Sequence, residues 1–330
     1  MSHYPDRVAA YLAVPAIGGG TSLEDDIREW TSSQPLRDLV EDFGGDSRIC
    51  TRDDLFERLR LLDEFSDRWD TRKGQERNLA DQLDLTPGQS VRIIAAADAL
   101  GLVESRPPEH HAYDHVLVLG GLLRACLARP ARAAQLIQSG DIVAGAVTAL
   151  GGHRPFRGDE FELAQLAGLP DLGEEFAALD AGTRRAFGLG EPLEVTGVES
   201  SLPGGAWTVH GYKWRNVDVR VAAAPSSEPA ARRANTADSY EWFARTIGRL
   251  EGGEHVLIIT TTIYVPAQHA AALRMLALPH DVKVETVGIE PGAVISQLAQ
   301  TFTPSHYLQE IRSAIRSIRD LVVYVGGTAP

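Results

Sequence analysis

The feature that most constrains the fold of this chain is a change in its hydrophobic period. Residues 1–108 show helical spacing and no convincing strand, whereas the sequence beyond Pro107 and Pro108 alternates short apolar runs with helical segments. Short apolar runs separated by helices are typical of βαβ units whose strands are covered on both faces. We therefore predict an α/β protein with a helical N-terminal region at 1–108 and a Rossmann-like domain at 109–330. That domain is expected to be an open parallel sheet of about five strands with helices on both faces.

Five segments carry the strand pattern, and helical segments lie between them. The expected strands are 115–119, 144–150, 217–223, 255–262 and 282–287. The expected helices are 130–139, 161–169, 235–250 and 267–277. Residues 171–216 break the alternation with a helix, Gly/Pro-rich turns and a hairpin through 207–210, so we predict an insertion that forms a lid or a rim. A last helix at 304–321 is expected to pack on the sheet.

Composition favours a small molecule as the partner over a nucleic acid or a membrane. The formal net charge is −13, and binding of phosphates needs clustered Lys and Arg. The N-terminus lacks the pattern of an export signal, and no segment approaches the roughly 20 apolar residues that span a bilayer. The two cysteines, Cys50 and Cys126, have no CxxC spacing and no His set beside them, so we expect no metal site. These observations predict a cytoplasmic protein.

Polar residues and glycines cluster where the expected strands end, which is where open parallel sheets bind ligands. Two strands end in glycine pairs, and glycine allows either close approach of a ligand or a simple tight turn. The spacing is not GxGxxG, so the standard dinucleotide motif is absent. The polar residues that follow later strands either bind a ligand or cap the next helix. The candidate binding residues are Gly120, Gly121, Gly151, Gly152, Arg154, Ser227, Asn235, Thr236, Ser239, Thr260, Thr261, Thr262 and Gln268.

Three side chains near these strand ends are candidates for proton transfer. His153 follows the second glycine pair, Glu160 lies shortly beyond it, and Tyr264 follows the fourth strand. Glu160 is equally well explained as an acidic residue at the N-terminus of a helix. A phosphoester hydrolase is an alternative, weakened by the absence of a dense Asp/His metal set or paired carboxylates at the strand ends.

The order of these motifs resembles the SanA/ElyC/YdcF family of Rossmann-like proteins. The matching pieces are YDHVLVLGG, RPARAAQLIQSG, ALGGHRPFRGDE, ANTADS and IITTTIYVPAQHAAALRML, which cover about residues 113–291. The chain is most similar to the soluble, YdcF-like branch, for which S-adenosylmethionine is the implied ligand. The resemblance itself supplies no established reaction, and a transferase that uses S-adenosylmethionine on a second small substrate is the activity that we consider. After the fourth strand the family often has a His and an Arg, where this chain has YVP and Gln268. The resemblance implies pocket roles for Gly151, Gly152, Glu160, Asn235 and Thr236.

A different function is suggested by residues 78–103, which resemble the helix-turn-helix of winged-helix repressors. In that interpretation Gln89, Ser90 and Arg92 open the recognition helix of a DNA-binding regulator. Acidic and basic residues nearly balance in this region, and no basic wing follows it, which argues against DNA as the main partner. Otherwise the segment is a helical hairpin that packs on the sheet or on a second subunit, and the latter arrangement predicts a homodimer through the N-terminal helices.

Overall fold

The computed structural model describes residues 11–20, 22–71, 82–289 and 299–327. The chain divides into two compact units. Unit 1 is formed by residues 1–104 and 302–330, and unit 2 by residues 105–301. The first boundary lies close to the expected linker, but the C-terminal segment belongs to unit 1 and not to the sheet domain.

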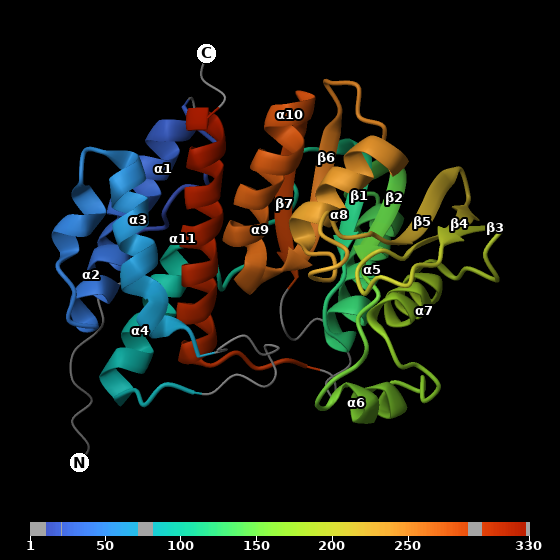
Figure 1. Ribbon diagram of the computed structural model, residues 1–330, viewed down its shortest axis with the longest axis horizontal. Coiled ribbons are helices and arrows are strands. Elements are labelled where there is room, and N and C mark those ends of the chain that lie inside the picture. Colours follow the sequence, from blue (N-terminus) through green and yellow to red (C-terminus); the bar gives the residue numbers. More distant parts are fainter. Residues whose placement is uncertain (1–10, 21, 72–81, 290–298, 328–330) are drawn as a thin grey trace. The chain divides into compact units, whose positions relative to one another are not determined.

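Unit 1 is helical in its described residues (Figure 1). The apolar face of the last helix is the one that the sequence predicts, but it packs on α3 and α4 instead of the sheet. Its residues Leu308, Ile311, Ile315 and Ile318 are fully buried there. None of the helices in the described ranges is both long and apolar enough to cross a membrane. The elements of unit 1 are α1 (Leu23–Ser32), α2 (Gln34–Asp42), η1 (Ser47–Thr51), α3 (Leu55–Ser66), η2 (Asp67–Trp69), α4 (Pro87–Ala99) and α11 (Pro304–Gly327).

Unit 2 contains one sheet of seven strands in the order β3-β4-β5-β2-β1-β6-β7. The five strands expected from the sequence all form, and they pair in parallel. The sheet has seven strands and not about five, because two further strands pair antiparallel at one edge. The strands are β1 (Ala112–Leu119), β2 (Val143–Gly151), β3 (Glu194–Val198), β4 (Trp207–Trp214), β5 (Val217–Ala223), β6 (His255–Thr261) and β7 (Lys283–Ile289).

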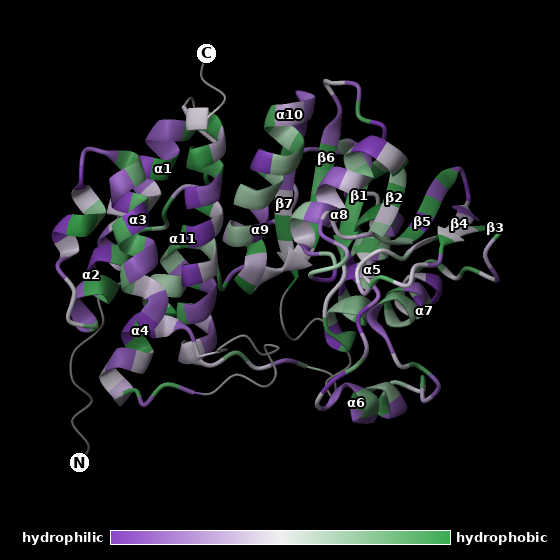
Figure 2. Ribbon diagram, viewed as in Figure 1, coloured by the Kyte–Doolittle hydropathy of each residue, from purple (hydrophilic) through white to green (hydrophobic). Residues whose placement is uncertain are grey.

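Helices cover both faces of the sheet, because the side chains of each strand alternate between the two faces. One face packs on α5, α6 and α7, and the other packs on α8, η4, α9 and η6. The strands are largely hydrophobic, whereas the helices are amphipathic (Figure 2). The helices are α5 (Leu123–Ser139), α6 (Glu160–Leu166), α7 (Glu175–Phe187), α8 (Thr236–Trp242), η4 (Phe243–Ile247), η5 (Thr262–Tyr264), α9 (Val265–Ala272), η6 (Leu273–Ala277) and α10 (Leu278–His280).

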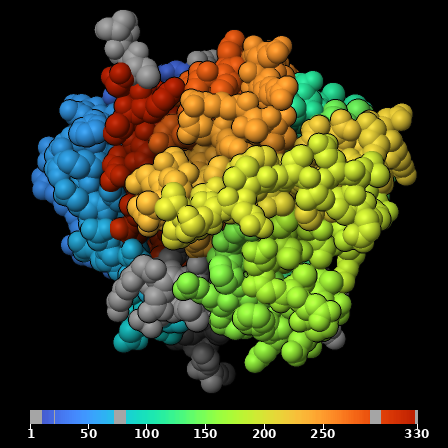
Figure 3. Space-filling model, turned by 45° about the vertical axis from the view of Figure 1, so that its right-hand side comes forward, coloured from blue at the N-terminus to red at the C-terminus, as the bar shows by residue number. Residues whose placement is uncertain are grey.

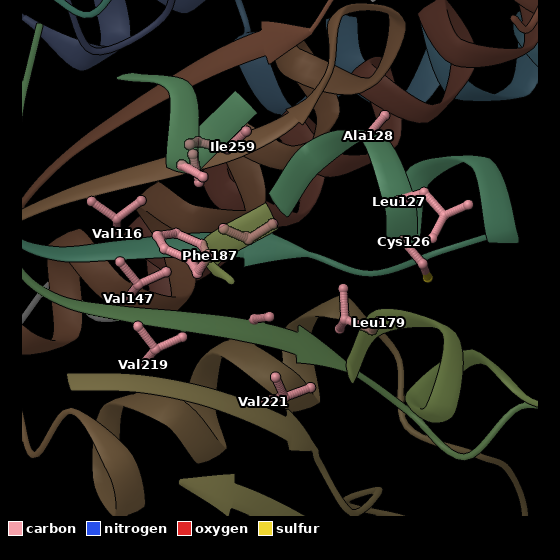
Figure 4. Packing of buried hydrophobic residues seen from close by; sticks show 14 of the residues in the cluster. Val116, Cys126, Leu127, Ala128, Val147, Leu179, Phe187, Val219, Val221 and Ile259 are labelled. Atoms are coloured by element: carbon pink, nitrogen blue, oxygen red, sulfur yellow. The ribbon is translucent and has the colours of Figure 1, made fainter. Parts of the chain in front are cut away.

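The segment expected to form a lid is part of this core. Its helix α7 packs against α5, and its last strand β4 joins the sheet beside β5. Leu179 of α7 lies close to Cys126 of α5 and to Val221 of β5 in the buried cluster (Figure 4). The sequence of 171–216 breaks the βαβ rhythm because it adds antiparallel strands at the sheet edge, which need no crossover helix between them.

The contact between α5 and α7 depends on Gly182. A Cβ atom at this position would overlap the backbone carbonyl of Cys126. We expect Gly182→Ala to lower the free energy of unfolding by about 2–3 kcal/mol, because two helix backbones would have to move apart. Urea denaturation measures the change. Gly190→Ala is the matched control, since no atom lies within 4 Å of its new Cβ; equal effects of the two substitutions would contradict this packing.

Candidate functional site

The strand order reverses between β1 and β6. From β1 the chain adds β2 and β5 on one side, and it then crosses to add β6 and β7 on the other side. Ligands of open α/β sheets bind where the strand order reverses in this way, outside the carboxyl ends of the strands. Here the loop after β1 begins with Gly120 and Gly121, and η5 follows β6. Gly121 has φ 149°, a conformation that favours glycine.

Arg129 holds the two sides of this reversal together. Its guanidinium is buried and donates hydrogen bonds to the carbonyl oxygen of Leu119 at 2.9 Å, to that of Gly120, and to Thr261 Oγ1 at 3.1 Å. It also lies 5.7 Å from the centre of the Tyr264 ring. The expected site residues Thr261 and Tyr264 therefore meet an arginine that sequence reasoning missed. The only signal was a charged residue on the apolar face of α5.

A second buried arginine, Arg154, organises the carboxyl ends of β1 and β2. Only 4% of Arg154 is exposed. Its Nη1 and Nη2 lie 2.6 Å and 2.8 Å from the two carboxylate oxygens of Glu160, and its Nε lies 3.0 Å from Glu175 Oε2. Nη2 also donates to the carbonyl oxygen of Gly121 at 3.1 Å. The expected site residues Arg154 and Glu160 are thus brought together with Glu175, which sequence reasoning missed.

Glu160 extends this network to two stretches of backbone. It accepts hydrogen bonds from the backbone N–H groups of Leu123, at the start of α5, and of Arg157. Burial alone would lower the pKa of Arg154, but the hydrogen bond to Glu160 and the charges of both glutamates outweigh it and raise that pKa. Burial raises the pKa of Glu175 despite its ion pair with Arg154. Within this network Glu160 therefore forms an ion pair with Arg154 and accepts a hydrogen bond from the backbone at the start of α5.

The two glycine pairs differ in what surrounds them. A Cβ at Gly120 would lie 2.6 Å from Glu175 Oε1, and one at Gly151 would lie 3.0 Å from Leu179. These glycines therefore make room for side chains of α7. Gly152 is different, because among the described residues no atom beyond its two chain neighbours lies within 4 Å of its Cβ position. Of the four glycines, Gly152 is the one with open space beside it.

The polar stretch before α8 forms a capped helix start. Asn235 Oδ1 accepts from the backbone N–H of Asp238, and an Asp238 oxygen accepts from that of Asn235, which completes a capping box. Asp238 also accepts from the backbone N–H of Ser227 at 3.1 Å and from Arg232. Burial would raise the pKa of Asp238, but these hydrogen bonds outweigh it and hold the pKa at about 2. Asn235 and Ser227 are thus tied to Asp238.

The other expected residues near α8 and β6 lie in the protein interior or make local contacts. Thr260 is fully buried and its hydroxyl has no hydrogen-bond partner within the described part of the chain, whereas the Thr262 hydroxyl donates to the carbonyl oxygen of Ile289 at 2.8 Å. The Ser239 hydroxyl donates to the carbonyl oxygen of Asn235, the residue before α8, and Gln268 lies 3.5 Å from the Thr236 hydroxyl. The structure therefore separates the expected residues into a group at the ends of β1 and β2, a pair beside Arg129 at the end of β6, and a group at α8 and α9.

His153 has polar partners on both ring nitrogens. Its Nδ1 lies 3.3 Å from Glu174 Oε2, and its Nε2 lies 3.1 Å from Thr208 Oγ1. The ring centre is 5.4 Å from that of Phe176. In the described part of the chain, no group of three or more His, Cys, Asp or Glu side chains is placed to hold a metal ion.

The segment considered for DNA binding uses its polar residues within unit 1. Gln89 and Thr86 form a capping box at the start of α4, and Arg92 pairs with Asp42 at 2.5 Å. Residues 82–86 are not helical, and the rest of the expected first helix, up to residue 81, lies outside the described residues. The described residues therefore contain the second helix of the expected pair but not a helix directly before its turn.

These features define a mixed α/β protein whose mostly parallel sheet reverses its strand order beside a buried arginine–glutamate network. Comparison with known proteins shows that the chain belongs to the Rv3785 family. It is 33% identical over 332 residues to "Uncharacterized protein Rv3785" of Mycobacterium tuberculosis, covering 91% of this chain and 90% of that protein. "Uncharacterized protein Mb3814" of Mycobacterium bovis matches with the same values. The Rv3785 N-terminal domain family matches residues 16–101, in unit 1. No solved structure matches the chain.

The Arg154 network makes a prediction about stability. Arg154→Met should lower the free energy of unfolding by about 3–5 kcal/mol, because it leaves Glu160 and Glu175 buried without their cation. Arg245→Met is the control, since its side chain is 71% exposed and its ion pair with Glu241 is worth about 1 kcal/mol at most. Chemical denaturation of both variants measures the difference. A loss below about 1 kcal/mol for Arg154→Met would show that the network is not structurally important.

Asp238 predicts a dependence of stability on pH. Its folded-state pKa of about 2 lies below the ordinary value of 3.8, so its contribution is present above pH 3.8 and is lost as the pH falls through about 2. Asp238→Asn should therefore cost about 1–2 kcal/mol at pH 7, and the gap to the parent protein should narrow as the pH is lowered from 5 towards 2. Denaturation curves at several pH values test this. A gap that stays constant with pH would assign the effect to packing and not to the charge.

Proposed function

We propose that this protein binds an adenosine-containing small molecule, with S-adenosylmethionine favoured, at the carboxyl ends of the parallel strands. The observation that carries the proposal is the reversal of strand order between β1 and β6, because sheets with this order bind nucleotides at that place. The choice of S-adenosylmethionine comes from the resemblance to the YdcF-like branch. An enzyme of this kind would be a transferase that acts on a second small substrate.

Two features near the strand ends support a ligand that approaches the backbone closely and carries an anionic group. Gly152 leaves open space where β2 ends, so a ligand can approach the backbone there. Arg233 lies near enough to Glu175 for its charge to lower the pKa of that carboxyl group. A guanidinium near Glu175 suits the carboxylate of S-adenosylmethionine or the phosphates of a nucleotide. In the space-filling view, the yellow segment that includes β4 borders the green segment that includes α6 (Figure 3).

The proposal includes a cytoplasmic location. Both cysteines are buried and free of a disulfide bond, which is usual in a reducing compartment. A homodimer through the N-terminal helices stays a prediction, which the mass of the protein in solution would test.

Isothermal titration calorimetry tests the proposed ligand. We expect S-adenosylmethionine to bind more tightly than adenosine, and ATP is included as a second ligand that shares the adenosine group. Gly152→Val should weaken binding about tenfold or more, which corresponds to about 1.4 kcal/mol, because its side chain occupies the open space where β2 ends. Gly190→Val is the control, with equally open surroundings but no place at a strand end. Absence of heat with every adenosine compound at millimolar concentration would refute the proposal.

A further inference from the structure

We propose that Glu174, His153 and Thr208 form an acyl-transfer triad in which the Thr208 hydroxyl is the nucleophile. The proposal rests on two distances: His153 Nδ1 lies 3.3 Å from Glu174 Oε2, and His153 Nε2 lies 3.1 Å from Thr208 Oγ1. A nucleophile within hydrogen-bond reach of a base, which is itself oriented by a third group, is the arrangement that activates a hydroxyl. It does not depend on the adenosine ligand proposed above.

The donors and acceptors in this chain of contacts settle the direction of proton transfer. A carboxylate only accepts hydrogen bonds, so the Nδ1 atom that faces Glu174 carries the proton. Nε2 of the neutral ring is then an acceptor, and the Thr208 hydroxyl donates to it. This is the tautomer in which a histidine serves as general base towards a hydroxyl group.

The backbone holds His153 and Glu174 side by side. Pro155 and Glu174 form an antiparallel bridge, the Glu175 N–H donates to the carbonyl oxygen of Arg154 at 2.9 Å, and the Phe156 N–H donates to that of Gly173 at 2.8 Å. Side chains alternate along such an extended pair. Arg154 and Glu175 are therefore buried together, whereas their chain neighbours His153 and Glu174 keep 29% and 38% of their side-chain surface exposed.

The sheet brings Thr208 to the same end of the molecule. Thr208 is opposite Ala223 of β5, and Ala223 is in turn opposite Gly151 at the end of β2, two residues before His153. Since β4 runs antiparallel to β5, its first residues lie at the carboxyl end of the parallel strands. The nucleophile thus comes from strand β4 and the base from the loop that follows β2, and the sheet pairing brings the two to the same end of the sheet.

Two glycines leave the triad open to a substrate. A Cβ at Gly197, on the neighbouring strand β3, would lie 2.7 Å from the carbonyl oxygen of Trp207 and 3.5 Å from Thr208 Oγ1, so a side chain there would crowd the hydroxyl. Gly152, next to His153, has no described atom other than those of its two chain neighbours within 4 Å of its Cβ position. Phe176 supplies an apolar wall, with its ring centre 5.4 Å from that of His153. An uncharged acyl ester or thioester fits such a partly apolar, partly exposed site.

The proposed reaction is hydrolysis of the ester or thioester in two steps, acylation of Thr208 and then deacylation by water. Thr208 Oγ1 attacks the carbonyl carbon of the ester or thioester, its proton moves to His153 Nε2, and the carbonyl π electrons move to the carbonyl oxygen. The intermediate collapses as the bond to the leaving oxygen or sulfur breaks, and the leaving group takes the proton from Nε2. Water then attacks the acyl-threonine and gives a proton to Nε2, and that proton returns to Thr208 Oγ1 as the carboxylic acid leaves.

Labelling of the nucleophile tests the triad. The full-length protein is incubated with p-nitrophenyl acetate or a fluorophosphonate, and the modified residue is located by peptide mass spectrometry. We expect one adduct, on Thr208, that is absent in Thr208→Val and forms at least about 100-fold more slowly in His153→Gln. Glu174→Gln, which loses the charge that orients His153, should slow it by about tenfold or more. Thr196→Val is the control, because Thr196 is an exposed threonine on the neighbouring strand.

A second measurement separates loss of the nucleophile from loss of the fold. Thr208→Cys places a thiol beside His153, while both natural cysteines are buried. Iodoacetamide should alkylate this thiol at least about tenfold faster than it alkylates the double variant with His153→Gln, because His153 removes the thiol proton. An adduct outside Thr208, no adduct at all, or equal alkylation of the two cysteine variants would overturn the proposal.

Discussion

The buried ion pairs of Arg154 are the interaction on which the carboxyl end of the sheet depends. One guanidinium joins the end of β2 to α6 through Glu160 and to α7 through Glu175, and it also reaches the carbonyl oxygen of Gly121 after β1. A charge removed from water is costly unless it is fully paired, and here each group has a partner of opposite charge. The loops that surround the proposed ligand site therefore have little freedom to separate.

The same network explains features that look functional in the sequence. Gly120 and Gly151 are glycines because side chains of α7, Glu175 and Leu179, fill the space where their Cβ atoms would lie. Glu160 accepts hydrogen bonds from the backbone of Leu123 and Arg157 besides its pair with Arg154. The network and the proposed sites lie in one region, which fits the need of a site for chemistry to be held by groups that cannot move. Of the residues next to this network, Gly152 has open space beside it, and His153 and Glu174 keep exposed side-chain surface.

The sequence predicts the parallel part of the sheet well, because the period and the length of the apolar runs in the sequence indicate which residues are buried locally. All five expected strands form, and the apolar face of α11 is the one predicted. The predictions fail where a partner comes from a distant segment. The pattern of α11 shows that Leu308 and Ile315 must be buried, but an apolar stripe packs equally well on helices or on a sheet. Likewise, the segment 171–216 has the turns of an insertion, and only the pairing of β4 with β5 makes it part of the sheet.

For the candidate site, the sequence by itself determined where the parallel strands end, and therefore which loops we predicted to carry a site, since these ends can be located from the apolar runs alone. It also identified His153, Glu160, Arg154 and the glycine pairs as residues of those loops. The tertiary structure decided what each of them contacts. Glu174, Glu175, Thr208 and Arg129 come from other elements, and no local pattern shows that they meet the strand ends. The reason is physical: spacing along a chain reports which face of an element is buried, whereas ion pairs and hydrogen bonds between elements depend on how the whole sheet is assembled.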